Sequence, residues 1–439
     1  MESKTCENLI RENVPGQGSA CECMLADDVR KYIDDHAEEF YELLVTLAQI
    51  PSPSHHEEKR AEFLVKLLDG WGAEGVRVDE ALNVIIPFGT ARDALAGRAA
   101  SDTTEETSTA DGNGAAKDAA GKFADGTAVP DLDVFTAHTD VVFPDMTPLP
   151  FHTDGDRLCC PGIGDDTACV CAMLMVVKYM LDNHLSPKTG GVLFVCNSCE
   201  EGLGNLKGIR QICNDYGKRM RMHISFDGSY SNIDHRAVGS IRMRVTVRTC
   251  GGHSYSAFGN PNAIAHLAAI ISDLYQIEVP KRGRTTYNVG TIEGGTSVNT
   301  IAQQASMLCE FRSDDKDDLA EMQAHFDRIF EAHRSADVSV DVEVVGVRPC
   351  ENLTEEQAAK REEIISDTKK MLERIYGKEV SLTPASTDCN IPLSLGIPAL
   401  CFGNYLGHGA HTREEYILRS SLRPGYEVAF ETVLRYVNL

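Results

Sequence analysis

The sequence predicts an α/β fold, with a mostly parallel sheet flanked by helices and a smaller α+β domain inserted into it. The chain has 439 residues, which is more than one hydrophobic core usually serves, so two domains are expected. Between residues 132 and 227 apolar strand-like runs alternate with helical ones, which implies right-handed crossovers between parallel strands. From residue 237 the sequence pattern changes to one of strands in which polar and apolar residues alternate.

The N-terminal part predicts an extension followed by two helices. Residues 1–27 are polar and contain Gly and Pro, so a flexible extension is expected there. From Asp28 the pattern becomes helical, with apolar residues between Phe40 and Leu47 at three- and four-residue spacing before the breaker PSPS. A second amphipathic helix is expected at about 56–71, and the short strands VRVDE and NVIIPF follow it.

Residues 91–130 differ in composition from the rest of the chain. They are rich in Ala, Gly, Asp, Ser and Thr and contain almost no large apolar side chains. Such a segment buries too little surface to offset the entropy lost on ordering, so a disordered, mobile insertion is predicted. With this insertion, the first part of the larger domain covers residues 28–236.

The later elements complete the two predicted domains. The inserted domain, residues 237–350, has the order β-α-β-β-α-β, which is typical of a ferredoxin-like fold. The larger domain resumes at 351–439, with a helix and the strand PALCF. The expected helices are 167–184, 204–216, 261–276, 315–334 and 354–376, and the expected strands are 132–138, 191–197, 223–227, a pair within 287–311, 338–345 and 398–402.

Charge and composition exclude several classes of partner. The chain has 42 Lys and Arg against 66 Asp and Glu, a formal charge of -24, and such a surface repels phosphate backbones, so no nucleic-acid partner is expected. No window approaches the ~18 apolar residues of a membrane span, and the N-terminus has no apolar signal region. No membrane partner is therefore expected. The 15 cysteines are odd in number and lie within apolar segments, which favours a reduced, cytoplasmic protein.

Acidic and imidazole side chains gather where the predicted strands end. In an open α/β sheet ligands bind beyond the carboxyl ends of the strands. Each group alone has an ordinary explanation: a helix N-cap, a turn residue, or an exposed helix start. Together, so many carboxylates facing one crevice would repel strongly, and these explanations fail. The groups are His138, Asp140, Asp165, Asp166, Glu200, Glu201, Asp227 and His411.

Divalent cations would resolve this repulsion. Two imidazoles and several carboxylates suit a pair of borderline divalent ions, Zn²⁺ first, with Co²⁺ or Mn²⁺ as alternatives. Two such ions share a water, lower its pKa and stabilise the oxyanion formed when it attacks a carbonyl. A neighbouring carboxylate that binds neither ion then serves as general base.

The motifs around these groups resemble a known family. They occur in family-like order and spacing from about residue 40 to the C-terminus, and they are similar to those of the M20 family of dinuclear zinc exopeptidases and deacylases. The motifs are LAQIPSPSHHE, FTAHTDVV, PGIGDDTA, NSCEEG, SFDG, CGGHSYSAFGNPNAI, GTIEGGTSVNTIA and GAHTREE. The resemblance makes residues 28–236 and 351–439 the two parts of a catalytic domain.

The resemblance implies a set of metal ligands. Asp165 would bridge the two ions, His138 and Asp227 would bind one, and Glu201 and His411 the other.

The same resemblance assigns two further residues near the metals. Asp140 would orient His138, and Glu200 would be the base that acts on the bridging water. His408 competes with His411 as a ligand, and His411 is preferred because the sequence after it matches the family's His-Thr-x-x-Glu.

The inserted domain resembles the family's lid and dimerisation domain, which implies a homodimer. His253 matches a histidine that steadies the oxyanion in the neighbouring subunit's site, with an ordinary loop histidine as the alternative. Asn299 and Arg312 match substrate-holding positions, and Arg312 would face a peptide carboxylate; cross-strand structural roles stay open for both.

The sequence therefore predicts a cytoplasmic metallo-aminopeptidase of short peptides, most similar to peptidase T and other tripeptidases. A carboxypeptidase or N-acyl amino acid amidohydrolase would use the same metal residues, and an inactive peptide-binding module is the non-enzyme alternative. Thr167, Ala168 and Cys169 replace the Lys and Gly of many members, which leaves the subfamily open.

Overall fold

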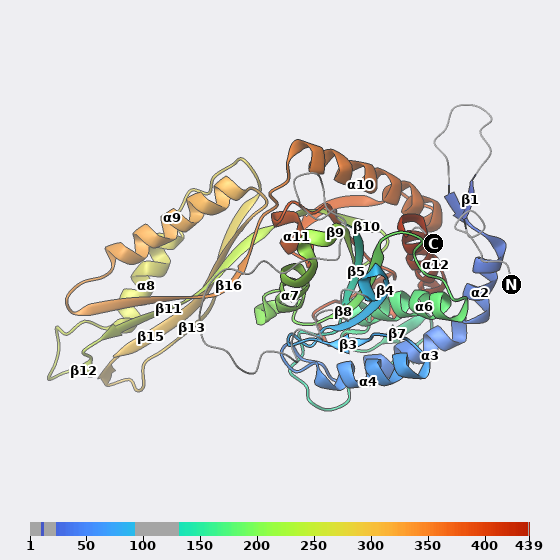
Figure 1. The fold of residues 1–439 in the computed structure, drawn as a ribbon. Coiled ribbons are helices and arrows are strands. Elements are labelled where there is room, and N and C mark those ends of the chain that lie inside the picture. The colour runs from blue at the N-terminus through green and yellow to red at the C-terminus, as the bar shows by residue number, and fades with distance from the viewer. Residues whose placement is uncertain (1–9, 13–22, 93–130, 438) are drawn as a thin grey trace, which may run out of the picture. The chain divides into compact units, whose positions relative to one another are not determined.

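The computed structural model describes residues 10–12, 23–92, 131–437 and 439, and it divides into two compact units (Figure 1). The first unit comprises Met1–His235, Leu353–Thr383 and Leu395–Leu439, and the second Arg236–Asn352 and Pro384–Ser394. Most of the predicted insertion 91–130, and most of the predicted extension 1–27, lie outside the described residues.

The second unit includes one segment that the sequence analysis placed in the larger domain. Residues Pro384–Ser394 belong to it because they bond to the strands that enter and leave it. The Asn390 side-chain amide donates to the carbonyls of Val238 and Pro349, both at 2.8 Å, and Nη1 of Arg348 donates to the Ser386 carbonyl at 3.0 Å.

The first unit is built on an eight-stranded sheet with the order β17-β10-β18-β9-β5-β8-β4-β3. The pairs β18–β9, β9–β5 and β5–β8 are parallel, while β10–β18, β4–β8 and β3–β4 are antiparallel. The prediction of a mostly parallel sheet therefore holds for the centre and is wrong for these edge pairs. The strands are β3 (Arg77–Val78), β4 (Val84–Gly89), β5 (Leu132–His138), β8 (Gly191–Asn197), β9 (Met220–Phe226), β10 (Asn232–Ala237), β17 (Ser381–Ala385) and β18 (Ala399–Phe402).

Helices cover this sheet, and α6 (Cys169–Asp182) is the most deeply buried of those in the described residues. Its predicted start at residue 167 is too early, because Ile163–Ala168 forms a π-helical turn in which Asp165 has non-helical torsions. The other helices of the unit are α2 (Asp27–Asp35), α3 (Ala37–Ala48), α4 (Glu58–Gly70), α7 (Lys207–Tyr216), α10 (Glu355–Tyr376) and α12 (Arg419–Tyr436). Two 3₁₀ turns, Gly202–Gly204 and Gly217–Arg219, flank α7.

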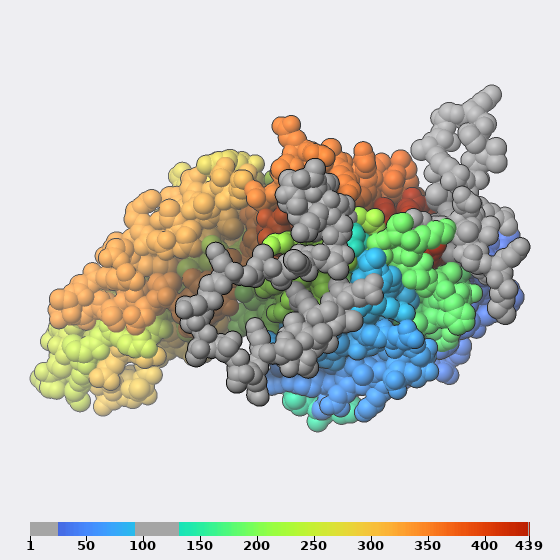
Figure 2. Space-filling model, in the orientation of Figure 1, coloured from blue at the N-terminus to red at the C-terminus, as the bar shows by residue number. Residues whose placement is uncertain are grey.

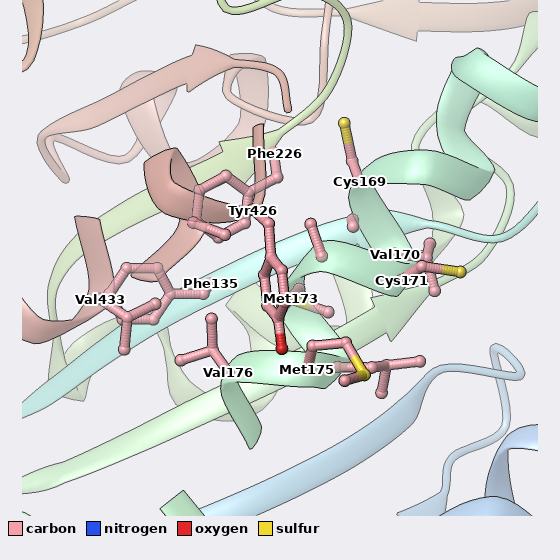
Figure 3. Close-up of a cluster of buried hydrophobic side chains, with 14 of the residues drawn as sticks. Phe135, Cys169, Val170, Cys171, Met173, Met175, Val176, Phe226, Tyr426 and Val433 are labelled. Carbon is pink, nitrogen blue, oxygen red and sulfur yellow. The ribbon is translucent and has the colours of Figure 1, made fainter. Parts of the chain in front are cut away.

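The core lies between the parallel strands, α6 and α12 (Figure 3). Phe135 of β5 stacks at 6.1 Å on Phe226 of β9, and Met173 and Val176 of α6 lie in the same cluster as Tyr426 of α12. Burying each such side chain stabilises the fold by about 1.5–3 kcal/mol. The strands that end at the candidate site therefore rest on a closely packed interior.

The second unit has the predicted β-α-β-β-α-β order. Its four-stranded sheet has the order β13-β15-β11-β16, and α8 and α9 pack against it (Figure 1). Asn262 and Asp315 cap the two helices with their side chains. The elements are β11 (Gly239–Thr249), β12 (Gly252–His253), α8 (Ala263–Leu274), β13 (Thr285–Gly294), β14 (Thr300–Ile301), β15 (Gln304–Ser313), α9 (Lys316–Ala332), β16 (Val338–Arg348) and α11 (Asn390–Ser394).

Small sheets complete the described part of the chain. The sheet β19-β20-β7-β6 joins the segment after β18 to the segment before α6. Its strands are β19 (Gly407–His408), β20 (Tyr416–Leu418), β7 (Arg157–Cys159) and β6 (His152–Asp154). Where a flexible extension was expected, β1 (Ile10–Glu12) pairs with β2 (Cys23–Leu25).

The surface agrees with the acidic composition. Helix α10, orange at the top of Figure 2, exposes Glu355, Glu356, Glu362, Glu363 and Asp367. Within the described residues, every helix is too short or too polar to cross a membrane.

Candidate metal centre

Three overlapping groups of side chains in the first unit have the spacing of metal ligands. In each group one ligand atom from every residue lies within 4.8 Å of the others. All five predicted metal ligands and Glu200 take part. The groups are His138, Asp165 and Asp227; His138, Glu200 and Glu201; and Asp165, Glu201 and His411.

The sheet brings these residues together because its parallel strands end at one edge. His138 is the last residue of β5 and pairs in register with Asn197, the last residue of β8. Glu200 and Glu201 follow β8, and Asp227 directly follows β9. Crossover topology thus places side chains from distant parts of the sequence at one rim.

Two of the alternative explanations from the sequence, the helix N-cap and the exposed helix start, do not fit the structure. Helix α6 begins at Cys169, and neither it nor the preceding turn has a side-chain cap, so Asp165 is not an N-cap. Glu200 and Glu201 are 6% and 5% exposed, so they do not form a solvated helix start. These side chains lie in a largely buried cluster of acids.

His138 is held in one orientation by Asp140. Nδ1 of His138 donates to the main-chain oxygen of Asp140 at 3.1 Å and lies 3.4 Å from its carboxylate oxygen Oδ1. Nε2 then points to Asp165, with 3.0 Å between Nε2 and Oδ1 of that carboxylate. The predicted orienting contact of Asp140 is thus present, and the second ring nitrogen, Nε2, is directed at Asp165, the predicted bridging residue.

Asp140 also fixes the segment that carries the two glutamates. Its Oδ1 accepts from the main-chain N–H of Glu200 at 2.9 Å, and its Oδ2 accepts from Glu201 N–H at 3.0 Å. The hydroxyl of Ser54 donates to Oδ2 at 2.7 Å. One buried carboxylate therefore sets the positions of both His138 and the Glu200-Glu201 pair.

Asp165 lies between the two histidines. Its Oδ1 faces His138, and its Oδ2 lies 3.1 Å from Nε2 of His411. The same His411 nitrogen lies 3.1 Å from Oε1 of Glu201. His408 belongs to none of the three ligand groups and instead lies beside the Tyr416 ring, so the geometry favours His411 over its competitor.

The electrostatics of the cluster call for added positive charge. Burial and the neighbouring Asp165 and Glu200 raise the pKa of Asp227 well above its usual value. Burial also raises the pKa of Glu201, to about 7, despite its bond to His411. The bonds to Asp165 and Glu201 raise the pKa of His411 to about 11. These shifts all mean that the cluster favours bound positive charge, which divalent ions would supply.

The donor set fits divalent metal ions. Since Nδ1 of His138 donates to the Asp140 carbonyl, Nε2 of the neutral ring turns a lone pair toward Asp165, and a second proton or a metal ion would make this contact favourable. Two imidazoles with several carboxylates are typical ligands of Zn²⁺ and of neighbouring transition metals. Because the two oxygens of Asp165 face different histidines, Asp165 would be able to offer one oxygen to each of two ions.

The other predicted site residues lie in the second unit. His253 is exposed, and its Nδ1 accepts from the Tyr255 N–H at 3.2 Å. Asn299 is exposed, and its side-chain oxygen accepts from the Ser297 hydroxyl at 2.8 Å.

Arg312 is partly occupied by an internal partner. It makes a bidentate pair with Glu310, at 2.8 and 3.0 Å. It also lines a pocket of about 240 Å³ with Arg284, Thr286 and Ser386. A substrate carboxylate at Arg312 would therefore compete with Glu310.

Two further residues hold the site together, and the sequence analysis gave neither of them a role of its own. Glu57 is buried, and its Oε1 accepts from the Cys199 N–H at 3.0 Å, just before Glu200. Glu415 accepts from three main-chain N–H groups of the turn that carries Asp165. Both glutamates occur within the quoted motifs, and Glu415 is the Glu of the His-Thr-x-x-Glu pattern that begins at His411.

Comparisons with known proteins identify a family for this chain. A family model described as peptidase family M20/M25/M40 matches residues 134–435. A peptidase M20 domain-containing protein of Schizosaccharomyces pombe is 26% identical over 176 residues, a match that spans 39% of this chain and 42% of that protein.

Two solved structures have a similar fold. A tripeptidase from Staphylococcus aureus superposes with a TM-score of 0.66 at 19% identity, covering 91% of this chain and 99% of its own. Aminopeptidase PepT from Bacillus cereus superposes with a TM-score of 0.62 at 19% identity, covering 91% and 98%. With the family model matching well over half of its length, the chain belongs to the peptidase family M20/M25/M40.

Proposed function

We propose that this M20 peptidase is a dinuclear metal-dependent aminopeptidase that acts on short peptides. The observation that carries the proposal is the set of three ligand groups linked by His138, Asp165 and Glu201, each of which belongs to two of the groups. The proposed ligands are His138, Asp165, Glu201, Asp227 and His411, with zinc as the preferred metal and cobalt or manganese as alternatives.

Glu200 is the proposed general base. When bound, the two ions would lower the pKa of a water and polarise the peptide carbonyl. Glu200 lies next to the proposed ligand Glu201 and is 6% exposed, so its carboxylate is close to the reacting atoms and largely shielded from solvent. It would take the proton from the attacking water and deliver it to the leaving amine.

The preference for a free amino terminus rests on likeness to other proteins. The tripeptidase and PepT structures share this fold, and the motif GTIEGGTSVNTIA is most similar to the peptidase T group. A carboxypeptidase or an N-acyl amino acid amidohydrolase would use the same metal residues, and an inactive peptide-binding module would need no Glu200.

A panel of three substrates separates these activities. Zinc-loaded protein is assayed on a tripeptide, its N-acetylated form and its C-amidated form. We expect activity on the tripeptide and the amide and loss on acetylation alone. Loss on amidation alone would indicate a carboxypeptidase, cleavage of the acetyl group a deacylase, and inactivity of the metal-loaded protein on all three would end the peptidase proposal.

We also propose that the second unit forms a homodimer and that His253 serves the neighbouring subunit. Exposed aromatic side chains near His253, Tyr255 at 88% and Phe258 at 89%, support a contact surface there. Glu200→Gln and His253→Ala should each be nearly inactive, and refolding them together should restore about a quarter of wild-type activity, because half of randomly mixed dimers carry one intact site of two. Confirmed mixed dimers without recovery would assign His253 to its own chain or to structure.

A further inference from the structure

Glu415 makes an unusual set of hydrogen bonds for a side chain outside the proposed ligand set. It is 2% exposed. Its Oε1 accepts from the main-chain N–H groups of Gly164 and Asp165, both at 2.9 Å, and its Oε2 accepts from that of Gly162 at 2.5 Å. One carboxylate thus holds the backbone at the start of the turn Ile163–Ala168, including Asp165, the residue that faces both histidines.

The turn leaves little room for another partner. A Cβ added at Gly164 would lie 2.7 Å from the Tyr405 ring, and one at Gly162 would lie 2.4 Å from Cγ1 of Val141. Gly162 also has a φ of 74°, which favours glycine. Because the backbone is packed so closely, its N–H groups depend on an acceptor that is built into the fold, since a buried N–H without an acceptor destabilises the folded state.

A carboxylate is the side chain that suits three converging donors. It has two oxygens, accepts only, and forms stronger hydrogen bonds than a neutral group. Glutamine has the same shape but would turn an NH₂ group toward at least one N–H, which replaces an attraction by a repulsion.

Glu415 also ties the turn to the segment that carries His411. It lies four residues after His411, and its main-chain oxygen accepts from the Cys160 N–H at 3.2 Å. The two segments that supply Asp165 and His411 are therefore joined to each other through both the side chain and the backbone of one residue.

We propose that Glu415 is a positioning residue of the dinuclear site, which fixes the Asp165 carboxylate between His138 and His411. The proposal rests on the proposed metal-dependent function. Asp165 belongs to two of the three ligand groups, whereas His411 belongs to one. Releasing Asp165 should therefore weaken the binding of both ions, which loss of a ligand to one ion does not do.

The test compares Glu415→Gln with Glu414→Gln, a matched control that removes the same charge from the adjacent exposed residue. Zinc dissociation constants are measured by competition with a chromophoric chelator, and folding of the metal-free proteins is followed by circular dichroism. Loss of a residue that supports a metal ligand typically lowers metal affinity 10- to 100-fold. We expect a loss of about this size for both ions in Glu415→Gln and wild-type affinities in Glu414→Gln, while His411→Ala should weaken mainly one ion.

Three outcomes separate the alternatives. Folded Glu415→Gln with wild-type zinc affinities would overturn the proposal and leave Glu415 a purely structural role. If Glu415→Gln does not fold, Glu415→Asp keeps the charge on a side chain one methylene shorter, and unchanged affinity for both ions in that variant would likewise overturn it. Failure of the wild-type protein to bind two ions would instead contradict the dinuclear function itself.

Discussion

The two ends of the central strands hold their carboxylates in opposite ways. At the amino ends of β5 and β9, Asp131 accepts two hydrogen bonds from Arg219, at 2.6 and 2.8 Å, and Arg221 makes a bidentate pair with Asp133. At the carboxyl ends, the ion pairs of Asp165 are made with His138 and His411.

The comparison shows at which end of the strands the protein itself supplies the positive charge that balances its carboxylates. Burial would raise the pKa of Asp131, but the bonds from Arg219 and Thr90 lower it overall. Burial raises the pKa of Asp133 in spite of Arg221, and it raises that of Asp227 far more, with help from neighbouring acids. The carboxylates at the amino ends of the strands are neutralised by arginines. Those at the carboxyl ends lack positive charge, which bound metal ions would supply.

The largest expected effect separates two adjacent residues at the carboxyl end. Glu200→Gln should retain both metal ions and lose about 10²- to 10⁴-fold in kcat, the usual contribution of a general base. Glu201→Gln should lose metal affinity as well, because Glu201 belongs to two ligand groups. Metal content by elemental analysis and kcat per bound metal are the measurements, and equal metal loss in both variants would make Glu200 a ligand.

The second expected effect is the change in stability caused by Asp227→Asn, which should have opposite signs with and without metal. The pKa of Asp227 is raised in the folded metal-free protein, so its charge opposes folding above pH ~4, the ordinary range of an aspartate. Metal-free Asp227→Asn should therefore be more stable than wild type at pH 8, by about 1–3 kcal/mol. The difference should vanish as the pH falls below about 4, where Asp227 becomes protonated in the unfolded state as well as in the folded state.

Zinc should reverse this order. Ligand at 100-fold above its dissociation constant stabilises a protein by about 2.7 kcal/mol per site, and Asp227→Asn should lose much of that gain. Urea unfolding with and without zinc measures both effects. A metal-free variant less stable than wild type at pH 8 would show that Asp227 is satisfied without a metal ion.

The matching change at the amino end should have the opposite sign. The pKa of Asp131 is lowered in the folded state, so its charge stabilises the fold above its ordinary pKa, and this contribution is lost as the pH falls. Its side chain is 26% exposed, so solvent screens the pair and Asp131→Asn should cost only about 1 kcal/mol at pH 7. Zinc affinity should stay at the wild-type value, and a change in it would mean that the two ends are coupled.

The carboxyl end could be predicted from the sequence, and the amino end could not. Parallel strands place His138, Glu200 and Asp227 at one rim by topology alone, so the order of elements was sufficient. The Asp131–Arg219 pair joins residues 88 positions apart and depends on strand register, which the sequence pattern does not give.

The supporting residues illustrate the same limit. Glu415 acts on backbone N–H groups some 250 positions earlier in the chain, and no periodicity of side chains reports such a bond. The antiparallel pairs at the edges of the sheet were missed because of how connections look in a sequence. The pattern of a connection between two antiparallel strands, which leaves and returns at the same end of the sheet, does not differ from that of any other connection. The second unit was predicted more completely, since its alternating strands and capped helices carry local signals.

The smallest expected effect concerns residues 91–130, most of which lie outside the described residues. Gly89 at the end of β4 and Leu132 at the start of β5 both pair with Gly191 of β8, so the segment leaves and returns at the amino end of the sheet. The Thr90 hydroxyl donates to Asp131 at 2.8 Å, so the two flanks are already close enough for a short turn to join them.

Deleting residues 95–128 should therefore leave kcat/KM on a tripeptide and the zinc affinity close to wild type. The site lies at the opposite ends of the same strands. Shortening a segment whose two flanks are already close together in the fold changes the unfolded chain more than the folded one. The control is a variant in which residues 95–128 are replaced by a Gly-Ser segment of equal length. A large fall in kcat/KM in both variants would mean that the sequence of this segment contacts substrate, and a fall in the deletion alone would mean that its length matters for joining β4 to β5.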